Sequence, residues 1–123
     1  MKKAKTMDRL VEHILTISDE EIRSLRLRDA AEVLRIYFFI AGVLFVLTRG
    51  ETFGRFVERE KLNRAALYLE NNKDMNIGVL SERLGFASKE EFSEKFENFF
   101  LVKPERYWEL AQIKARYSWE NKQ

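Results

Sequence analysis

Apolar residues recur at helical spacing along most of this chain, and short polar stretches separate the segments. Near the N-terminus the spacing predicts a helix from about residue 7 to residue 17, with these apolar positions: Leu10, Val11, Ile14, Leu15 and Ile17. Ser18 and Glu21 then form a capping-box pattern. This pattern is compatible with a helix that begins at Asp19, and also with a loop that closes ahead of a helix at residues 28–34.

Residues 28–48 contain no proline and no turn dipeptide, and a single glycine, Gly42, interrupts them. A glycine inside a helix costs about 1 kcal/mol relative to alanine. The segment is therefore either two helices with a tight turn near residues 35–37 or one continuous helix. Residues 36–47 carry no charged side chain. Because a membrane span needs about 20 apolar residues, this shorter run predicts a buried or interfacial helix.

A long helix is predicted from Thr52 to about Leu69, after Gly50, which suits a helix end with φ above zero. Its apolar face consists of Phe53, Phe56, Val57, Leu62, Ala65, Ala66 and Leu69. Residues 71–74, with the sequence Asn-Asn-Lys-Asp, are typical of a turn.

The next elements have the spacing of a helix-turn-helix unit. A short helix is predicted at residues 77–84, with Asn76 as its cap, and Gly85 suits the tight turn that follows. Ser88 caps the second helix, with Glu91 at the third helical position. One face of that helix carries Phe92, Phe96 and Phe99. Pro104 is suited to the first position of a last helix, which ends at about residue 118.

Composition fits an all-α chain and excludes several kinds of site. The 123 residues are 46% hydrophobic and 34% charged, which is enough for one domain or two small lobes. Cysteine is absent and His13 is the single histidine, so we expect neither a disulfide framework nor a metal centre. No nucleophile–base pair is visible. We therefore expect a protein that is not an enzyme and has no cofactor.

Three short motifs resemble the second helix-turn-helix of the AraC/XylS transcription regulators. They are Ile77-x-x-Leu80-Ser81-x-x-Leu84-Gly85-Phe86, then Phe92-x-x-x-Phe96, then Pro104-x-x-Tyr107. The likeness extends over about residues 10–107, and the length resembles that of the stand-alone members of the family. The resemblance implies two helix-turn-helix lobes of the homeodomain-like three-helix type, joined by a linker helix, with about seven helices in all. The expected divisions are residues 1–51, 52–70 and 71–123.

The family resemblance also implies a function. It implies a bacterial, cytoplasmic regulator that binds double-stranded DNA and has no small-molecule effector domain. In the second lobe the base-facing residues would be Lys89, Glu90, Ser93 and Glu94, while Arg106 and the basic termini would contact phosphates. The family commonly has arginine at the position of Glu94 and lysine at that of Glu97. Lys89 and Lys95 against four glutamates leave the helix a net charge of −2, and the whole chain is only +2.

The first lobe differs more strongly from the family. Its recognition helix would be residues 38–48, and its outward positions include the apolar residues Phe39, Val43, Val46 and Leu47. These side chains cannot donate a hydrogen bond to a base or a phosphate. They are either buried within the monomer or form an exposed surface for a protein partner or a second copy. Two hypotheses follow: a DNA-binding regulator, or a degenerate domain that binds protein through this helix.

Overall fold

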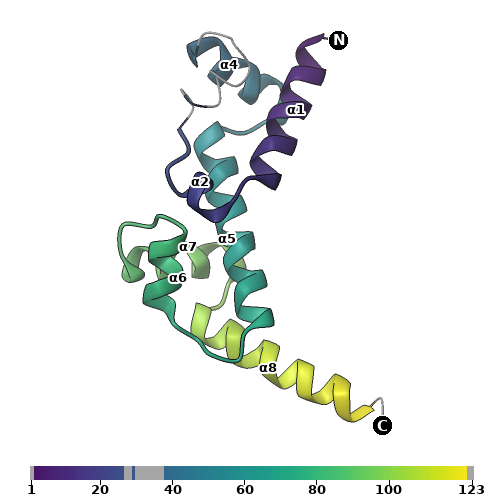
Figure 1. Ribbon diagram of the computed structural model, residues 1–123, viewed down its shortest axis with the longest axis vertical. Coiled ribbons are helices and arrows are strands. Elements are labelled where there is room, and N and C mark those ends of the chain that lie inside the picture. Colours follow the sequence, from purple (N-terminus) through teal and green to yellow (C-terminus); the bar gives the residue numbers. More distant parts are fainter. Residues whose placement is uncertain (1, 27–28, 30–37, 122–123) are drawn as a thin grey trace. The chain divides into compact units, whose positions relative to one another are not determined.

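The computed structural model describes the backbone of residues 2–26, 29 and 38–121, and the side chains of residues 8–26, 29 and 42–119. Within these residues there are seven helices and no strand, so the predicted all-α class is confirmed (Figure 1). The helices are α1 (Lys2–Thr16), α2 (Asp19–Arg23), α4 (Phe38–Arg49), α5 (Phe53–Asn71), α6 (Ile77–Arg83), α7 (Lys89–Phe100) and α8 (Pro104–Asn121). The chain forms two compact units, unit 1 at residues 1–60 and unit 2 at residues 61–123.

Unit 1 has a core of aliphatic residues from α1 and α2 and aromatic residues from α4 and α5. Phe45 is at its centre, with its ring edge-on to Phe53 at 5.5 Å and to Phe56 at 5.4 Å. Aromatic rings stabilise a core beyond their buried area in this geometry. Leu15 lies outside this core and is half exposed, because it is one position past Ile14 and so points about 100° away on the helix. The core comprises Leu10, Ile14, Ile17, Ile22, Phe45, Phe53, Phe56 and Val57.

The local signals of unit 1 act as predicted where the structure describes them. The Ser18 side chain accepts a hydrogen bond from the Glu21 backbone N–H at 3.1 Å, so the capping box begins a helix. Gly50 has φ +75° and its N–H donates to the Val46 carbonyl at 2.8 Å, which ends α4. Residues 30–37 lie outside the described part of the chain. The question whether residues 28–48 form one helix or two therefore also lies outside the described residues.

The core of unit 2 lies among α5, α6, α7 and α8. Phe92 and Phe96 are completely buried, and a stack of tilted rings continues from Phe96 to Phe100 at 4.5 Å. The prediction that Phe99 shares the face of Phe92 and Phe96 is wrong, because Phe99 is 43% exposed. Phe100 takes the inward place, because its ring packs against Phe96 of α7 and Tyr107 of α8. The buried set is Leu62, Ala65, Ala66, Leu69, Leu80, Leu84, Phe92 and Phe96.

The turn between α6 and α7 is closed by backbone hydrogen bonds at a glycine. Gly85 has φ +82°; its N–H donates to the Glu82 carbonyl at 3.1 Å, and the Phe86 N–H donates to the Ser81 carbonyl at 3.0 Å. This pair of bonds is the Schellman arrangement, which requires a left-handed residue at the position of Gly85. The helix-turn-helix geometry predicted from the sequence is therefore present in unit 2.

Candidate nucleic-acid interface

The start of α7 is held in place by its two side-chain caps. Ser88 accepts a hydrogen bond from the Glu91 N–H at 3.0 Å, and the Glu91 carboxylate accepts one from the Ala87 N–H at 3.0 Å. At the start of α6, Asn76 Oδ1 accepts a hydrogen bond from the Val79 N–H, also at 3.0 Å. The first turns of α6 and α7 are therefore both fixed by local caps.

The structure brings together three of the four α7 residues predicted to face bases. Lys89 and Glu90 are exposed and Ser93 is half-buried, and all three line an open hollow. The other residues around this hollow are Met75, Asn76, Ile77, Gly78 and Glu105. Glu94 is exposed on the same helix but does not line the hollow. The lining of the hollow includes side chains of both charges and the Ser93 hydroxyl, which are groups that can form hydrogen bonds with polar edges.

Arg106, the predicted phosphate contact, is not part of this hollow. Its guanidinium forms an ion pair with Glu109 on α8 at 3.2 Å, and both side chains are 56% exposed. The neighbouring Glu105 is the α8 residue that reaches the hollow. Exposed pairs of this kind contribute little stability, so Arg106 can exchange Glu109 for another anion at small cost.

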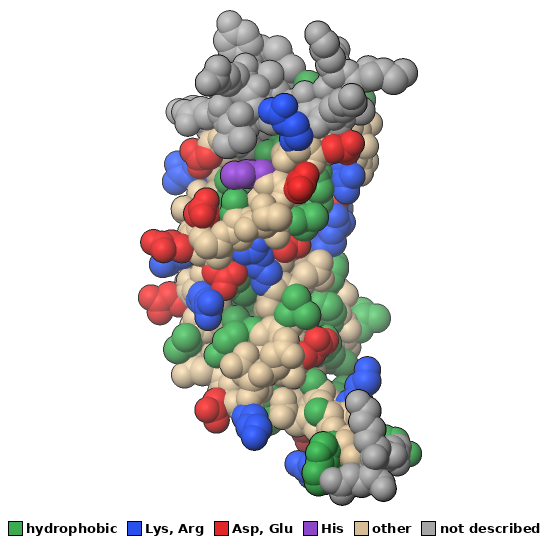
Figure 2. All heavy atoms as spheres, turned by 45° about the vertical axis from the view of Figure 1, so that its right-hand side comes forward, with side chains coloured by type: hydrophobic (Ala, Val, Ile, Leu, Met, Phe, Trp, Pro, Cys, Tyr) green, Lys and Arg blue, Asp and Glu red, His purple; other side chains and the backbone are tan. Residues whose placement is uncertain are grey.

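Acidic groups dominate the α7 surface. Lys95 forms an ion pair with Glu91 at 3.0 Å, one turn away. The hydrogen bond from Lys95, together with that from the Ala87 N–H, holds the pKa of the Glu91 carboxyl below its usual value. Glu90, Glu94 and Glu97 are exposed. Figure 2 shows the same balance on a larger scale, since basic and acidic side chains are interspersed on the face shown and neither forms a continuous field.

In unit 1, α4 has apolar residues on two sides. Phe45 is buried and Leu44 half-buried, whereas Val43, Val46 and Leu47 are 57%, 44% and 75% exposed. The structure therefore leaves these three apolar side chains exposed, and their use as a contact surface stays a prediction. The side chain of Phe39 lies outside the described residues. The Thr48 hydroxyl donates a hydrogen bond to the Leu44 carbonyl at 2.7 Å, so this polar group of α4 is bonded within its own helix.

The arrangement of helices is similar to that in several solved structures. The C-terminal domain of AraT, a response regulator from Geobacillus stearothermophilus, has a TM-score of 0.73 at 21% identity, over 85% of this chain and 84% of that chain. An AraC-type regulator from Chromobacterium violaceum, described as containing a DNA-binding domain, has a TM-score of 0.73 at 20% identity, over 85% and 94%. The transcription activator xylR, described as xylose-binding, has a TM-score of 0.72 at 18% identity, over 86% of this chain and 27% of that chain.

This chain has the AraC-type fold. At these identities the likeness is one of fold. No protein-family model matches the sequence, and neither does any curated protein. The 27% coverage of xylR shows that the AraC-type fold also occurs as a small part of a longer chain.

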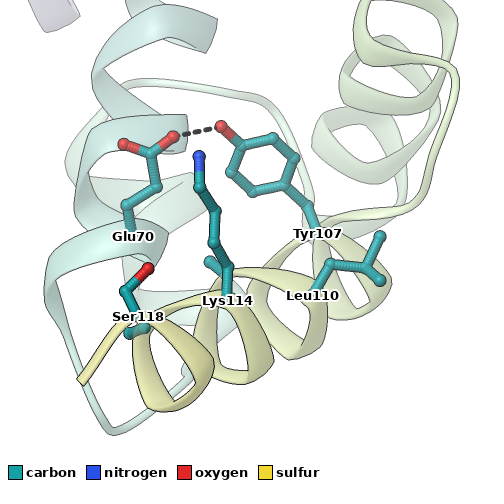
Figure 3. A pocket seen from close by; sticks show the side chains of 7 residues that line it. Glu70, Tyr107, Leu110, Lys114 and Ser118 are labelled. Carbon is teal, nitrogen blue, oxygen red and sulfur yellow. Dashed lines mark hydrogen bonds between the residues drawn. The ribbon is translucent and has the colours of Figure 1, made fainter. Parts of the chain in front are cut away.

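A second polar cluster, which the sequence did not indicate, lies between α5 and α8 of this AraC-type fold. Figure 3 shows Glu70, Tyr107 and Lys114 directed into one groove, with the Tyr107 hydroxyl donating a hydrogen bond to the Glu70 carboxylate. Burial, followed by the hydrogen bond and charge of Glu70, raises the pKa of Tyr107 to about 12. Glu70 and Tyr107 are 37 positions apart, so no local pattern links them.

Among the described residues, no three His, Cys, Asp or Glu side chains gather in a way that could hold a metal ion. In the same part of the chain, no helix combines the length and the apolar content that a bilayer crossing needs.

Proposed function

We propose that this protein is a helix-turn-helix transcription regulator that contacts duplex DNA through α7 of unit 2. The observation that carries the proposal is the intact turn between α6 and α7, which presents the exposed first turns of a capped helix. A recognition helix contacts base edges with its N-terminal residues. The AraC-type neighbours, one of them described as containing a DNA-binding domain, support the same function.

The α7 side chains allow direct reading of base edges. Lys89 can donate to guanine O6 and N7, Glu90 and Glu94 can accept from cytosine N4, and Ser93 can do either. The net negative charge of the helix opposes approach to phosphates and removes part of the counterion release that drives DNA binding. We therefore expect weak binding to random duplex DNA that is detectable at low salt.

The experiment is a titration against random duplex DNA over a series of salt concentrations. Log affinity should fall with log salt, and Glu94→Lys should strengthen binding and steepen the slope by about one unit, as expected for one added phosphate contact. Glu12→Lys on α1 is the charge-matched control, because Glu12 is exposed but lies on neither predicted recognition helix. The proposal would be refuted if neither the unmodified chain nor Glu94→Lys showed detectable binding at any salt concentration.

A second candidate function concerns α4, whose exposed apolar surface favours protein over DNA. Val43, Val46 and Leu47 offer no hydrogen-bond donor to the duplex, while an apolar patch of this kind is typical of a protein contact. In the same titration, Leu47→Lys should leave the salt slope unchanged if α4 faces protein. A slope that steepens as it does for Glu94→Lys would place α4 at the DNA and refute this candidate.

A further inference from the structure

Helix α8 carries apolar side chains on the side that faces the core and also on a side that is exposed. One face packs on the core of unit 2 through residues that include Tyr107 and Trp108. On the exposed side Leu110, Ile113 and Tyr117 are 42%, 51% and 65% exposed, and Leu110 also borders the groove beside Glu70. Spacings of three and four residues place these three side chains in one stripe along the helix. A surface helix normally has polar residues on its outer face, so the stripe indicates a contact surface.

The C-terminal part of α8 has little packing within unit 2. Every described side chain from Ile113 to Trp119 is exposed, and α8 continues past the ends of α6 and α7 in Figure 1. Short helices without tertiary contacts are only marginally stable in water. A partner along the outer stripe would therefore stabilise these turns as well as bury their apolar side chains.

The charges beside the stripe indicate which partner fits. Glu109 and Arg116 are seven residues apart, so they lie on the same flank of the stripe, about two turns from each other. When two such helices pack antiparallel about a twofold axis near Ile113, each Glu109 lies opposite Arg116 of the second copy. The surface is thus complementary to itself in charge and in apolar pattern, as a twofold interface requires.

We propose that the outer face of α8 binds α8 of a second copy of this chain in antiparallel orientation. Leu110 and Tyr117 of one copy then flank Ile113 of the other, and the two Glu109–Arg116 pairs set the register. Glu109 is already ion-paired with Arg106, but this pair is largely solvent-exposed and leaves the carboxylate accessible. Since the stripe is much smaller than a standard interface, the dimer should be weak and should form as the protein concentration rises.

Equilibrium sedimentation of the full chain over a range of concentrations tests the proposal. We expect a monomer–dimer equilibrium whose dissociation constant rises by about tenfold or more in Ile113→Glu, because this substitution places two carboxylates against each other at the axis. Ser118→Glu is the matched control, as Ser118 is an exposed α8 residue that does not belong to the stripe of Leu110, Ile113 and Tyr117. Circular dichroism verifies that both variants remain helical. A monomer at every concentration, or equal effects of the two variants, would overturn the proposal.

A charge exchange tests the antiparallel register. Glu109→Arg and Arg116→Glu should each weaken self-association, because like charges then lie opposite each other at both ends. An equimolar mixture of the two variants should associate again, since unlike charges face each other in the mixed dimer. If the mixture stays monomeric while the unmodified chain dimerises, the register is wrong.

Val43→Glu separates α8 from the apolar surface of α4. We expect this variant to dimerise normally; loss of the dimer in Val43→Glu but not in Ile113→Glu would assign self-association to α4 and overturn the proposal.

DNA titration at concentrations where the chain is monomeric should give the same affinity for Ile113→Glu as for the unmodified chain. Failure of the dimer is therefore distinguishable from failure of DNA binding.

Discussion

At the scale of single residues, Leu101 has a backbone conformation that suits glycine. It follows α7 with φ +67°, and its N–H donates to the Glu97 carbonyl at 2.7 Å. The side chain is 84% exposed, so it contributes almost no burial in return for the strain. A residue with a side chain pays about 1–2 kcal/mol in the left-handed region.

Leu101→Gly should therefore stabilise the protein. The relief of strain exceeds the extra backbone entropy of glycine in the unfolded chain, and we expect a net gain of about 0.5–1 kcal/mol. Urea denaturation measures this gain. Leu67→Gly is the control, because Leu67 is exposed inside α5, where glycine should cost about 1 kcal/mol. Equal losses for both variants would show that Leu101 is unstrained in solution.

At the scale of elements, α8 is attached to the end of α5 by hydrogen bonds between residues far apart in sequence. Trp108 Nε1 donates to the Asn72 carbonyl at 2.9 Å, and Gln112 donates to the same oxygen at 3.2 Å. The Tyr107 hydroxyl donates to Glu70, two residues before Asn72. These bonds satisfy carbonyl and carboxylate groups at a helix end that has no basic residue in its last turn.

The Tyr107–Glu70 bond predicts a pH dependence at the alkaline end. The phenol of Tyr107 must stay protonated to donate, and its pKa is raised from 10.0 to about 12 in the folded chain. Its contribution to stability is therefore complete below pH 10 and is lost as the pH rises from about 10 to about 12. Urea midpoints measured across this range should fall more steeply for the unmodified chain than for Tyr107→Phe. Tyr117→Phe, an exposed change on the same helix, should behave like the unmodified chain.

If the urea midpoints of the unmodified chain and Tyr107→Phe decline in parallel between pH 10 and pH 12, loss of the Tyr107 proton does not change the stability of the fold, and the prediction is wrong. The paired tyrosine variants are needed because alkaline pH changes the charge of a protein at more than one kind of side chain. Only the difference between the two curves reports on Tyr107.

At the scale of the whole molecule, each compact unit has its own hydrophobic cluster and both have nearly balanced charge. The chain has 22 basic and 20 acidic residues, whereas a compact DNA-binding domain usually has a clear basic excess. The chain therefore combines the AraC-type fold with a surface whose electrostatic attraction to DNA is weak. This balance is the reason that the proposed DNA binding depends on low salt and that self-association through α8 is not opposed by a large net charge.

Much of the fold follows from the sequence because its signals are local. Asn76, Gly85 and Ser88 act within four residues of their own positions, so their roles as cap, turn and cap can be predicted from spacing alone. The buried aromatic pair Phe92 and Phe96 follows from helical periodicity in the same way. The candidate residues Lys89, Glu90 and Ser93 could be proposed because their places on α7 follow from that cap.

Tertiary structure decided what no local pattern contains. Phe99 and Phe100 are neighbours in sequence, and only the packing of α7 against α8 makes Phe100 the inward ring. The Glu70–Tyr107 contact joins positions too distant for any periodicity to relate. The apolar surface of α4 and the stripe of α8 consist of the same kinds of residue as the core. Periodicity cannot show which of two apolar faces of a helix packs against the core. Capping and helical spacing are properties of neighbouring residues, whereas burial depends on which element lies opposite.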